Sequence, residues 1–341
     1  MGERILIVKL AAIGDVLRTT PLLSGLKRKY PESHITWVSS REALPLLQNN
    51  PLIDRLLPLE WPSILPLEVE SFDLILGLEK EPPGAALTSK IEAREKKGFG
   101  LTPQGTVFPL NRASEYAFRL GLNDDLKFHR NSKTYPELIF EIAELEYRRD
   151  EYLLFLSPED LSFAQTRALQ WGLHSGSIRI GLNTGAGGVF ANKAWTVEGY
   201  CGLIEALRRE MNPRILLLGG PREGERNRRI LEKVGDRVID TGCENTLGQF
   251  AALINLCDLV VTGDTTALHI AIGLRKKVVG IFGPTCASEI ELYGRGEKVI
   301  TPLSCAPCYR RSCQVTPNCM EGIPVEEVMK KIRLLCSAGG G

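Results

Sequence analysis

The sequence predicts an α/β protein made of two Rossmann-like, doubly wound domains that face each other across a cleft. Apolar, β-branched runs typical of strands buried on both faces recur along the chain. These runs lead into glycine-rich or polar turns and then amphipathic stretches, as expected for strands joined by helices in a parallel sheet. The length of 341 residues exceeds that of one ordinary α/β domain, so two cores are expected.

The first half opens with a strand, a loop, a helix and a second strand within forty residues. Pro21 suits the first position of the helix, and Pro31 ends it. The predicted strands are residues 4–10, 34–39 and 72–77.

The second half repeats this pattern, with a helix over residues 197–211. The usual lengths of connecting loops place the boundary between about residues 150 and 176. We assign residues 1–174 to the first domain, 175–323 to the second and 324–341 to a final helix and tail. Ligands of such sheets bind at the carboxyl ends of the strands, so the cleft between the domains is the expected site. The predicted strands are residues 177–182, 214–220, 237–239, 258–262 and 277–282.

The charge balance and hydropathy exclude several classes of partner. The 42 Lys and Arg residues against 41 Asp and Glu residues give a net charge of +1, so no overall field attracts nucleic acid or an anionic bilayer. The longest apolar runs fall far short of the ~20 residues of a membrane-spanning helix. The amino-terminal apolar stretch is too short for a secretory signal. We expect a cytoplasmic monomer that binds no nucleic acid and touches a membrane only peripherally, at its inner face.

Asp15, after the first strand, is the candidate general base. A carboxylate at the carboxyl edge of a sheet can face an incoming hydroxyl group. Gly14 lets the backbone turn sharply and approach a ligand. The alternative for Asp15 is a helix-capping role.

A glycine-rich turn after the strand at 177–182 is a candidate phosphate site. Thr184 and Gly185 begin this turn, whose N–H groups can cradle a phosphate, and Lys193 adds a positive charge. Neither GxGxxG nor a GKS or GKT loop is present, so a structural turn with a solvated lysine remains the alternative.

The turn after residue 262 is the strongest candidate for binding an anion. Gly263 turns the chain, and the polar side chains of Asp264, Thr265 and Thr266 gather at the amino end of a short apolar helix. Free N–H groups and the helix dipole attract anions there. Asp264 either contacts sugar hydroxyls or caps the helix. For His269, about one turn further on, a core position is the alternative to ligand contact.

Two other strand ends carry candidate ligands. Thr285 follows Gly283 in a Gly-Pro turn and can offer its hydroxyl and amide groups to a phosphate, although a plain turn is the default. Glu223 or Glu225, after the strand at 214–220, can accept hydrogen bonds from ribose hydroxyls. The sequence does not choose between the two glutamates.

Four of the nine cysteines form a cluster near the carboxyl terminus. Thiolates this close in sequence can bind zinc or an iron–sulfur cluster. Their spacing departs from paired C-x2-C motifs, so free or redox-linked thiols are the alternative. The cluster consists of Cys305, Cys308, Cys313 and Cys319.

Together these stretches resemble glycosyltransferase family 9, the ADP-heptose:lipopolysaccharide heptosyltransferases. The resemblance covers nearly the whole chain. It implies a GT-B architecture, with an acceptor-binding first domain, a nucleotide-sugar-binding second domain and a final helix that packs back toward the first. The motifs, in order, are residues 7–21 (IVKLAAIGDVLRTTP), Lys193-x-Trp195, residues 219–221 (GGP), residues 263–269 (GDTTALH) and residues 283–285 (GPT).

The resemblance also implies residue roles. Asp15 matches the catalytic base, Lys193 the lysine that neutralises the donor diphosphate, and Asp264 the acidic residue at the donor sugar. Thr266 stands where many members have glycine, which leaves the donor preference open. The phosphate loops and the ribose contact are matched by Thr265, Thr266, Thr285 and either Glu223 or Glu225.

The implied reaction is the inverting transfer of a heptose or related sugar from a nucleotide-diphosphate sugar, with ADP-heptose as the expected donor. The implied acceptor is a lipopolysaccharide core or another lipid-linked saccharide. No D-x-D motif occurs in the sequence, which favours transfer without a metal or other cofactor. The alternatives are a nucleotide-sugar epimerase of the same architecture and a non-catalytic binding protein whose cysteines hold a metal.

Overall fold

The computed structural model describes residues 2–173, 176–187, 189–190 and 192–337. It divides into two compact units. The first comprises residues 1–155 together with Ser288–Glu291, and the second comprises Leu156–Ala287 and residues 292–341. Within the described residues, no helix is both long enough and apolar enough to span a bilayer.

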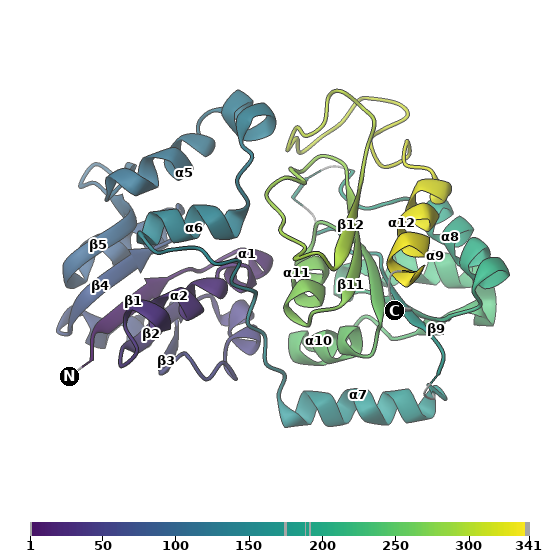
Figure 1. Ribbon diagram of the computed structural model, residues 1–341, viewed down its shortest axis with the longest axis horizontal. Helices are drawn as coiled ribbons and strands as arrows, with labels where there is room; N and C mark the ends of the chain where they lie inside the picture. The colour runs from purple at the N-terminus through teal and green to yellow at the C-terminus, as the bar shows by residue number, and fades with distance from the viewer. Residues whose placement is uncertain (1, 174–175, 188, 191, 338–341) are drawn as a thin grey trace. The chain divides into compact units, whose positions relative to one another are not determined.

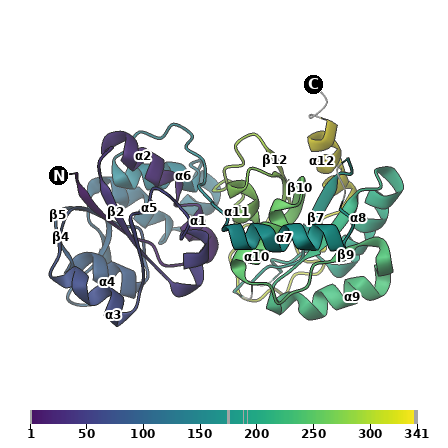
Figure 2. The same cartoon turned by 90° about the horizontal axis from the view of Figure 1, so that it is seen from below.

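The first unit contains a six-stranded sheet with helices on both faces, as far as its described residues show (Figures 1 and 2). The strand order is β3-β2-β1-β4-β5-β6, and all neighbours are parallel except the antiparallel pair β5 and β6. The strands are β1 (Arg4–Val8), β2 (His34–Ser39), β3 (Arg55–Pro58), β4 (Ser71–Gly77), β5 (Glu92–Leu101) and β6 (Val107–Pro109). The helices are α1 (Ile13–Leu17), α2 (Pro21–Lys29), α3 (Trp61–Ile64), α4 (Pro82–Lys90), α5 (Glu115–Leu120) and α6 (Tyr135–Ala143).

The central strand β1 explains the continuous apolar run at the start of the sequence. Ile5 and Ile7 are buried in a core that also contains side chains of α2 and α6. Leu6 and Val8 point to the opposite face and join a second core with residues of α4. Because successive side chains of a strand alternate between the two faces, burial of both faces requires an apolar residue at every position.

The second unit contains a parallel six-stranded sheet in its described residues, in the order β12-β11-β10-β7-β8-β9. Numbered within its own unit, each sheet has the order 3-2-1-4-5-6 of Rossmann folds. The strands are β7 (Arg179–Asn183), β8 (Arg214–Leu218), β9 (Ile239–Asp240), β10 (Leu259–Gly263), β11 (Lys277–Phe282) and β12 (Gly296–Ile300). The helices are α7 (Pro158–Gln170), α8 (Val197–Glu210), α9 (Gly224–Val234), α10 (Leu247–Asn255), α11 (Thr266–Gly273) and α12 (Val325–Ser337).

The limits of the two units differ from the predicted domain limits. Helix α7 lies along α10 (Figure 2), and a Cβ atom on Gly248 would stand only 2.3 Å from Oδ2 of Asp160. This close packing makes α7 part of the second unit, so the division falls between Phe155 and Leu156. The predicted boundary at residues 174 and 175 lies outside the described residues.

The final helix packs against its own unit. Val328, Met329 and Ile332 of α12 are fully buried in the core of the second unit. This core also contains apolar side chains of α8, against which α12 packs. The helix therefore forms part of the core of the second unit. Residues 338–341 of the predicted tail lie outside the described residues.

Candidate functional site

Each sheet has a topological switch point, where the connections from two neighbouring strands lead in opposite directions. It lies between β1 and β4 in the first sheet and between β7 and β10 in the second. Doubly wound sheets bind ligands in the crevice that forms at this point, beyond the carboxyl ends of the strands. Predicted site residues gather at both switch points.

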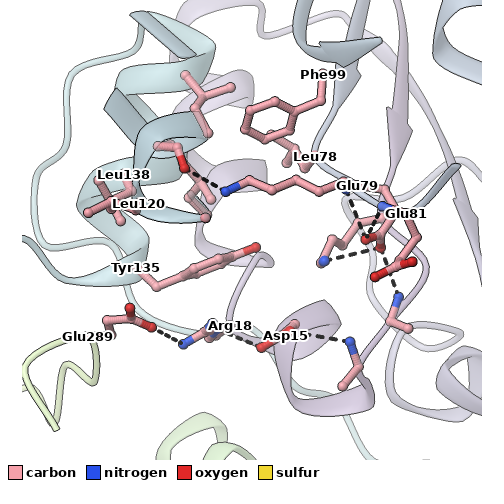
Figure 3. Close-up of a pocket in the computed structure, with 18 of the residues that line it drawn as sticks. Asp15, Arg18, Leu78, Glu79, Glu81, Phe99, Leu120, Tyr135, Leu138 and Glu289 are labelled. Carbon is pink, nitrogen blue, oxygen red and sulfur yellow. Dashed lines mark hydrogen bonds and ion pairs between the residues drawn. The ribbon is translucent and has the colours of Figure 1, made fainter. Parts of the chain in front are cut away.

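A pocket of about 360 Å³ opens at the switch point of the first sheet (Figure 3). This volume lies within the range of small-molecule sites. Its lining combines apolar side chains of β5, α5 and α6 with charged groups from the turns after β1 and β4. The charged lining residues are Lys9, Asp15, Arg18, Glu79, Lys80, Glu81, Lys127 and Glu289.

Asp15 occupies the third position of the short helix α1 and lines this pocket. Its Oδ2 accepts a hydrogen bond of 3.3 Å from the backbone N–H of Ala12, so the predicted capping alternative is also realised. Its Oδ1 lies 3.0 Å from Nε of Arg18, and its side chain remains 35% exposed. The carboxylate is thus held by protein groups while still facing the pocket.

Arg18 fixes the carboxylate of Asp15 in orientation. Its guanidinium stacks on the ring of Tyr135, with Cζ 3.8 Å from the ring centroid, and Nη1 lies 3.9 Å from Oε2 of Glu289. Burial opposes the positive charge, but Asp15 and Glu289 raise the pKa of Arg18 above its ordinary value. Arg18 is therefore a permanent cation, since arginine is already protonated at every physiological pH.

Glu79 is a site residue that the sequence analysis did not select. It is 5% exposed, and it accepts five hydrogen bonds: Oε2 from Nζ of Lys9 and the N–H groups of Leu10 and Ala11, and Oε1 from the N–H groups of Lys80 and Glu81. One carboxylate thus ties the turn after β1, which leads to Asp15, to the turn after β4. The sequence did contain a signal for Glu79, because it is a charged residue that closely follows a predicted strand. The same signal identified Asp15.

The neighbours of Glu79 are arranged around its charge. Nζ of Lys9 lies 3.2 Å from Oε2, and the two side chains are 7% and 6% exposed. Burial opposes the charge of Lys9, but Tyr135, Glu79 and Asp15 raise its pKa. A Cβ atom on Gly84 would stand 2.6 Å from Cβ of Glu79, so glycine is needed there to leave room for the carboxylate side chain.

The switch point of the second sheet carries a network of neutral polar groups. The side-chain amide of Asn183, at the end of β7, donates to the Thr262 hydroxyl at 2.9 Å and to the Thr265 hydroxyl at 3.3 Å. Thr265 is the N-cap residue of α11, and Thr266 is its first residue. The predicted anion site at the amino end of α11 therefore lies beside the turn after β7.

Lys193 lies next to this network. Its Nζ is 3.6 Å from Oδ2 of Asp264, and the two side chains are 18% and 17% exposed. A Cβ atom on Gly263 would stand 3.2 Å from the carbonyl oxygen of Lys193, so the two turns approach closely at the glycine. Trp195 holds this segment: it is 1% exposed, and its indole N–H donates to the carbonyl of Ile323 at 3.2 Å.

His269 is buried and lies near Asp264. The residue is 4% exposed within α11, as a core histidine would be. Its Nε2 nevertheless lies 3.8 Å from Oδ1 of Asp264. The histidine therefore lies beside the Asp264 carboxylate, at a distance beyond that of a hydrogen bond.

The structure separates the two candidate glutamates. Glu223 accepts a hydrogen bond of 3.0 Å from the N–H of Gly220, and its carboxyl carbon lies 3.2 Å from where a Cβ atom on Gly185 would stand. Glu225 instead pairs with Arg228 at 2.8 Å on the exposed side of α9. Only Glu223 lies at the turn after β7.

Three other predicted ligand contacts, Thr184, Gly283 and Thr285, have different surroundings in the structure. The Thr184 hydroxyl donates to the side chain of Asn227 at 2.5 Å, and Thr184 is fully buried. A Cβ atom on Gly283 would stand 2.8 Å from Sγ of Cys319, which gives this glycine a packing role. The Thr285 hydroxyl is buried and has no hydrogen-bond partner among the described residues. Gly188, in the glycine-rich turn, lies outside them.

The four clustered cysteines are free thiols, and only Cys319 is buried. Burial, followed by the proximity of Cys308, Cys313 and Cys305, raises the pKa of Cys319 to about 11. In the described part of the chain, no three His, Cys, Asp or Glu side chains are grouped so that they could hold a metal ion.

Two Rossmann-like units, one with a carboxylate in a pocket and one with a lysine beside a helix amino end, have the architecture of the GT-B class of glycosyltransferases. Residues 67–318 match the family model described as glycosyltransferase family 9 (heptosyltransferase), and the chain belongs to this family. This family is one of glycosyltransferases, so the match does not support the epimerase alternative.

Known proteins of similar sequence and structure agree with this assignment. The chain is 23% identical over 294 residues to the lipopolysaccharide core heptosyltransferase OpsX of Haemophilus influenzae, covering 81% of this chain and 78% of that protein. A family 9 glycosyltransferase structure from Veillonella parvula matches with a TM-score of 0.80 and 20% identity, over 99% and 98% of the two chains. The E. coli ADP-heptose LPS heptosyltransferase II matches with a TM-score of 0.69 and 20% identity, over 99% and 100%.

Proposed function

We propose that the chain transfers a heptose from a nucleotide-diphosphate heptose, with ADP-heptose as donor, to a saccharide of the lipopolysaccharide core, with inversion at the anomeric carbon. Membership of the family supports this, as does similarity to the Haemophilus core heptosyltransferase and to the E. coli ADP-heptose LPS heptosyltransferase. The observation that carries it is the pocket at the switch point of the first sheet, which presents the Asp15 carboxylate.

In this proposal the first unit binds the acceptor. Asp15 takes the proton of the acceptor hydroxyl, whose oxygen then forms the bond to the anomeric carbon. The bond from that carbon to the diphosphate breaks, and the nucleoside diphosphate leaves with the electron pair. Arg18 keeps the Asp15 carboxylate oriented toward the pocket. A single displacement of this kind inverts the configuration.

The second unit binds the donor. Lys193 and the N–H groups at the start of α11 stabilise the negative charge that develops on the departing diphosphate. Thr285 adds a hydroxyl to the phosphates, Glu223 accepts bonds from the ribose, and Asp264 accepts bonds from hydroxyls of the sugar. Because the protein supplies this positive charge, we propose that no metal ion takes part and that the enzyme works as a monomer at the inner membrane face.

The test compares Asp15→Asn with the parent chain, using ADP-heptose and a lipopolysaccharide core acceptor. A general base commonly contributes about 10²–10⁴-fold, so kcat should fall by this factor while the dissociation constant of the donor stays unchanged. Asp124→Asn is the matched control, because Asp124 is exposed and does not line the pocket. Near-normal turnover of Asp15→Asn would exclude the assigned base. Incubation with ADP-heptose alone tests the epimerase alternative, which requires that an isomerised sugar accumulates.

A further inference from the structure

Glu289 is an acidic residue of the first pocket to which the reaction proposed above gives no role. It lines the pocket, although in the sequence it lies between β11 and β12 of the second sheet. The segment Ser288–Glu291 belongs to the first unit, and the residues on both sides of it belong to the second. A short piece of the second half of the sequence therefore supplies one carboxylate of the pocket that presents Asp15.

The main chain of Glu289 is anchored in the first unit. Its carbonyl oxygen accepts a hydrogen bond of 2.9 Å from the N–H of Tyr135, the first residue of α6. The first N–H groups of a helix have no partner within the helix, so this contact satisfies one of them. The next residue, Ile290, is 2% exposed. The side chain of Glu289 therefore extends from a fixed point.

The carboxylate of Glu289 faces the guanidinium of Arg18 (Figure 3). Its Oε2 lies 3.9 Å from Nη1 of Arg18, while Oδ1 of Asp15 lies 3.0 Å from Nε of the same group. The side chains of Arg18 and Glu289 are each 13% exposed, so water screens their attraction less than on the open surface. Two carboxylates thus lie at different nitrogens of one planar cation.

This arrangement fixes the rotation of the guanidinium as well as its position. The Tyr135 ring, 3.8 Å from Cζ of Arg18, covers one face of the cation. Stacking confines a planar group to one layer but still lets it turn or slide within that layer. Negative charges at Nε and Nη1 oppose this motion, because any turn lengthens at least one of the two contacts.

The other titratable groups around Arg18 and Asp15 do not take over this task. Burial raises the pKa of Tyr152, so its hydroxyl stays neutral at physiological pH. Lys9 carries a positive charge and pairs with Glu79 at 3.2 Å. The groups that act on Arg18 and Asp15 are Lys9, Tyr135, Tyr152 and Glu289.

We propose that Glu289 is a positioning residue for the base: it holds the guanidinium of Arg18 in the orientation that presents the Asp15 carboxylate to the acceptor hydroxyl. This rests on the proposed function for the role of Asp15. Glu289 acts through Arg18 and does not bind the donor or the acceptor. Its removal therefore slows the chemical step and leaves the binding of both substrates unchanged.

The test measures transfer by Glu289→Gln with ADP-heptose and a lipopolysaccharide core acceptor. We expect kcat to fall about 10-fold, since a misplaced catalytic group loses much of its effect, while the acceptor KM and the donor dissociation constant stay the same. Glu289→Asp keeps the charge and should retain most of kcat. Glu291→Gln is the matched control, because Glu291 lies in the same segment, pairs with Arg149 at 3.2 Å and does not line the pocket.

Two further measurements separate a positioning role from a purely structural one. A nearby negative charge favours the protonated form of a carboxylate, so the acidic limb of the kcat profile should move to lower pH in Glu289→Gln but not in Glu291→Gln. In an Arg18→Met background, Glu289→Gln should cause no further loss of kcat, because the residue that transmits its effect is gone.

Three results would overturn the proposal. They are an unchanged kcat in Glu289→Gln, a raised acceptor KM with kcat intact, and a further loss of kcat when Glu289→Gln is added to Arg18→Met. Failure of the proposed function is distinct, because it appears as near-normal turnover of Asp15→Asn. A defective Asp15→Asn together with a normal Glu289→Gln leaves the function intact and removes only the role of Glu289.

Discussion

The most demanding test of the first site is the replacement of Glu79 by glutamine. The substitution preserves the shape of the side chain but removes the negative charge that pairs with Lys9 at 3.2 Å, where both side chains are at most 7% exposed. Breaking a buried ion pair from one side costs about 3–5 kcal/mol. In the parent chain each carboxylate oxygen of Glu79 accepts hydrogen bonds from two backbone N–H groups. The NH2 group of the glutamine would replace one of these oxygens, so a donor would face donors.

We expect Glu79→Gln to lower the stability of the first unit by about 3 kcal/mol, measured by urea unfolding. For a unit of this size that corresponds to a melting point lower by roughly 6–12 °C. The value of kcat should also fall, since the turn that leads to Asp15 loses its support, while the donor dissociation constant should not change. Glu60→Gln is the control, because its pairing with Arg41 lies on the surface.

The double variant Lys9→Met, Glu79→Gln separates the ion pair from the backbone bonds. With the lysine charge also removed, no uncompensated buried cation remains, so the double variant should be more stable than Glu79→Gln alone. A Glu79→Gln chain as stable as the parent would refute the reasoning.

Three further predictions concern other parts of the chain. Lys193→Met should weaken ADP binding about 10-fold or more in a titration, whereas Lys193→Arg should weaken it less. Gly199→Ala should cost about 1–3 kcal/mol in urea unfolding, because its Cβ atom would stand 2.5 Å from the Trp195 ring. Transfer should continue in the presence of EDTA, and loss of activity that added metal restores would disprove metal independence.

The buried parts of both sheets could be predicted from the sequence because burial on two faces leaves a direct signal. Strands β1, β2, β4, β7, β8, β10 and β11 all appear as apolar runs close to their observed limits. Strand β5 was missed because five of its first six residues are charged, and several of these are exposed. Among the described pairs, β6 lies beside residues 99–101 only, so residues 92–97 are at the edge of the sheet. Charged side chains are common at sheet edges, and hydropathy alone does not reveal such a segment as a strand.

A site residue could be predicted only where a charged or polar side chain closely follows a predicted strand. Asp15, Lys193 and Asp264 each follow a strand and could be selected individually. The pocket itself could not be predicted, because Arg18 is held by Tyr135 and Glu289, which come from distant parts of the chain. Contacts of this kind depend on how strands and helices pack, and that information is not contained in local spacing.

The two switch points differ in how firmly they hold their charges, and the difference suits the roles proposed for them. The Asp15 carboxylate has Arg18 at 3.0 Å and the N–H of Ala12 at 3.3 Å, so the base is fixed in place. Lys193 stands 3.6 Å from Asp264, which is beyond hydrogen-bonding distance. Lys193 can therefore turn toward a diphosphate without first breaking a direct hydrogen bond. A base that must meet a hydroxyl in one geometry benefits from rigidity, whereas a cation that follows a departing phosphate benefits from freedom to move.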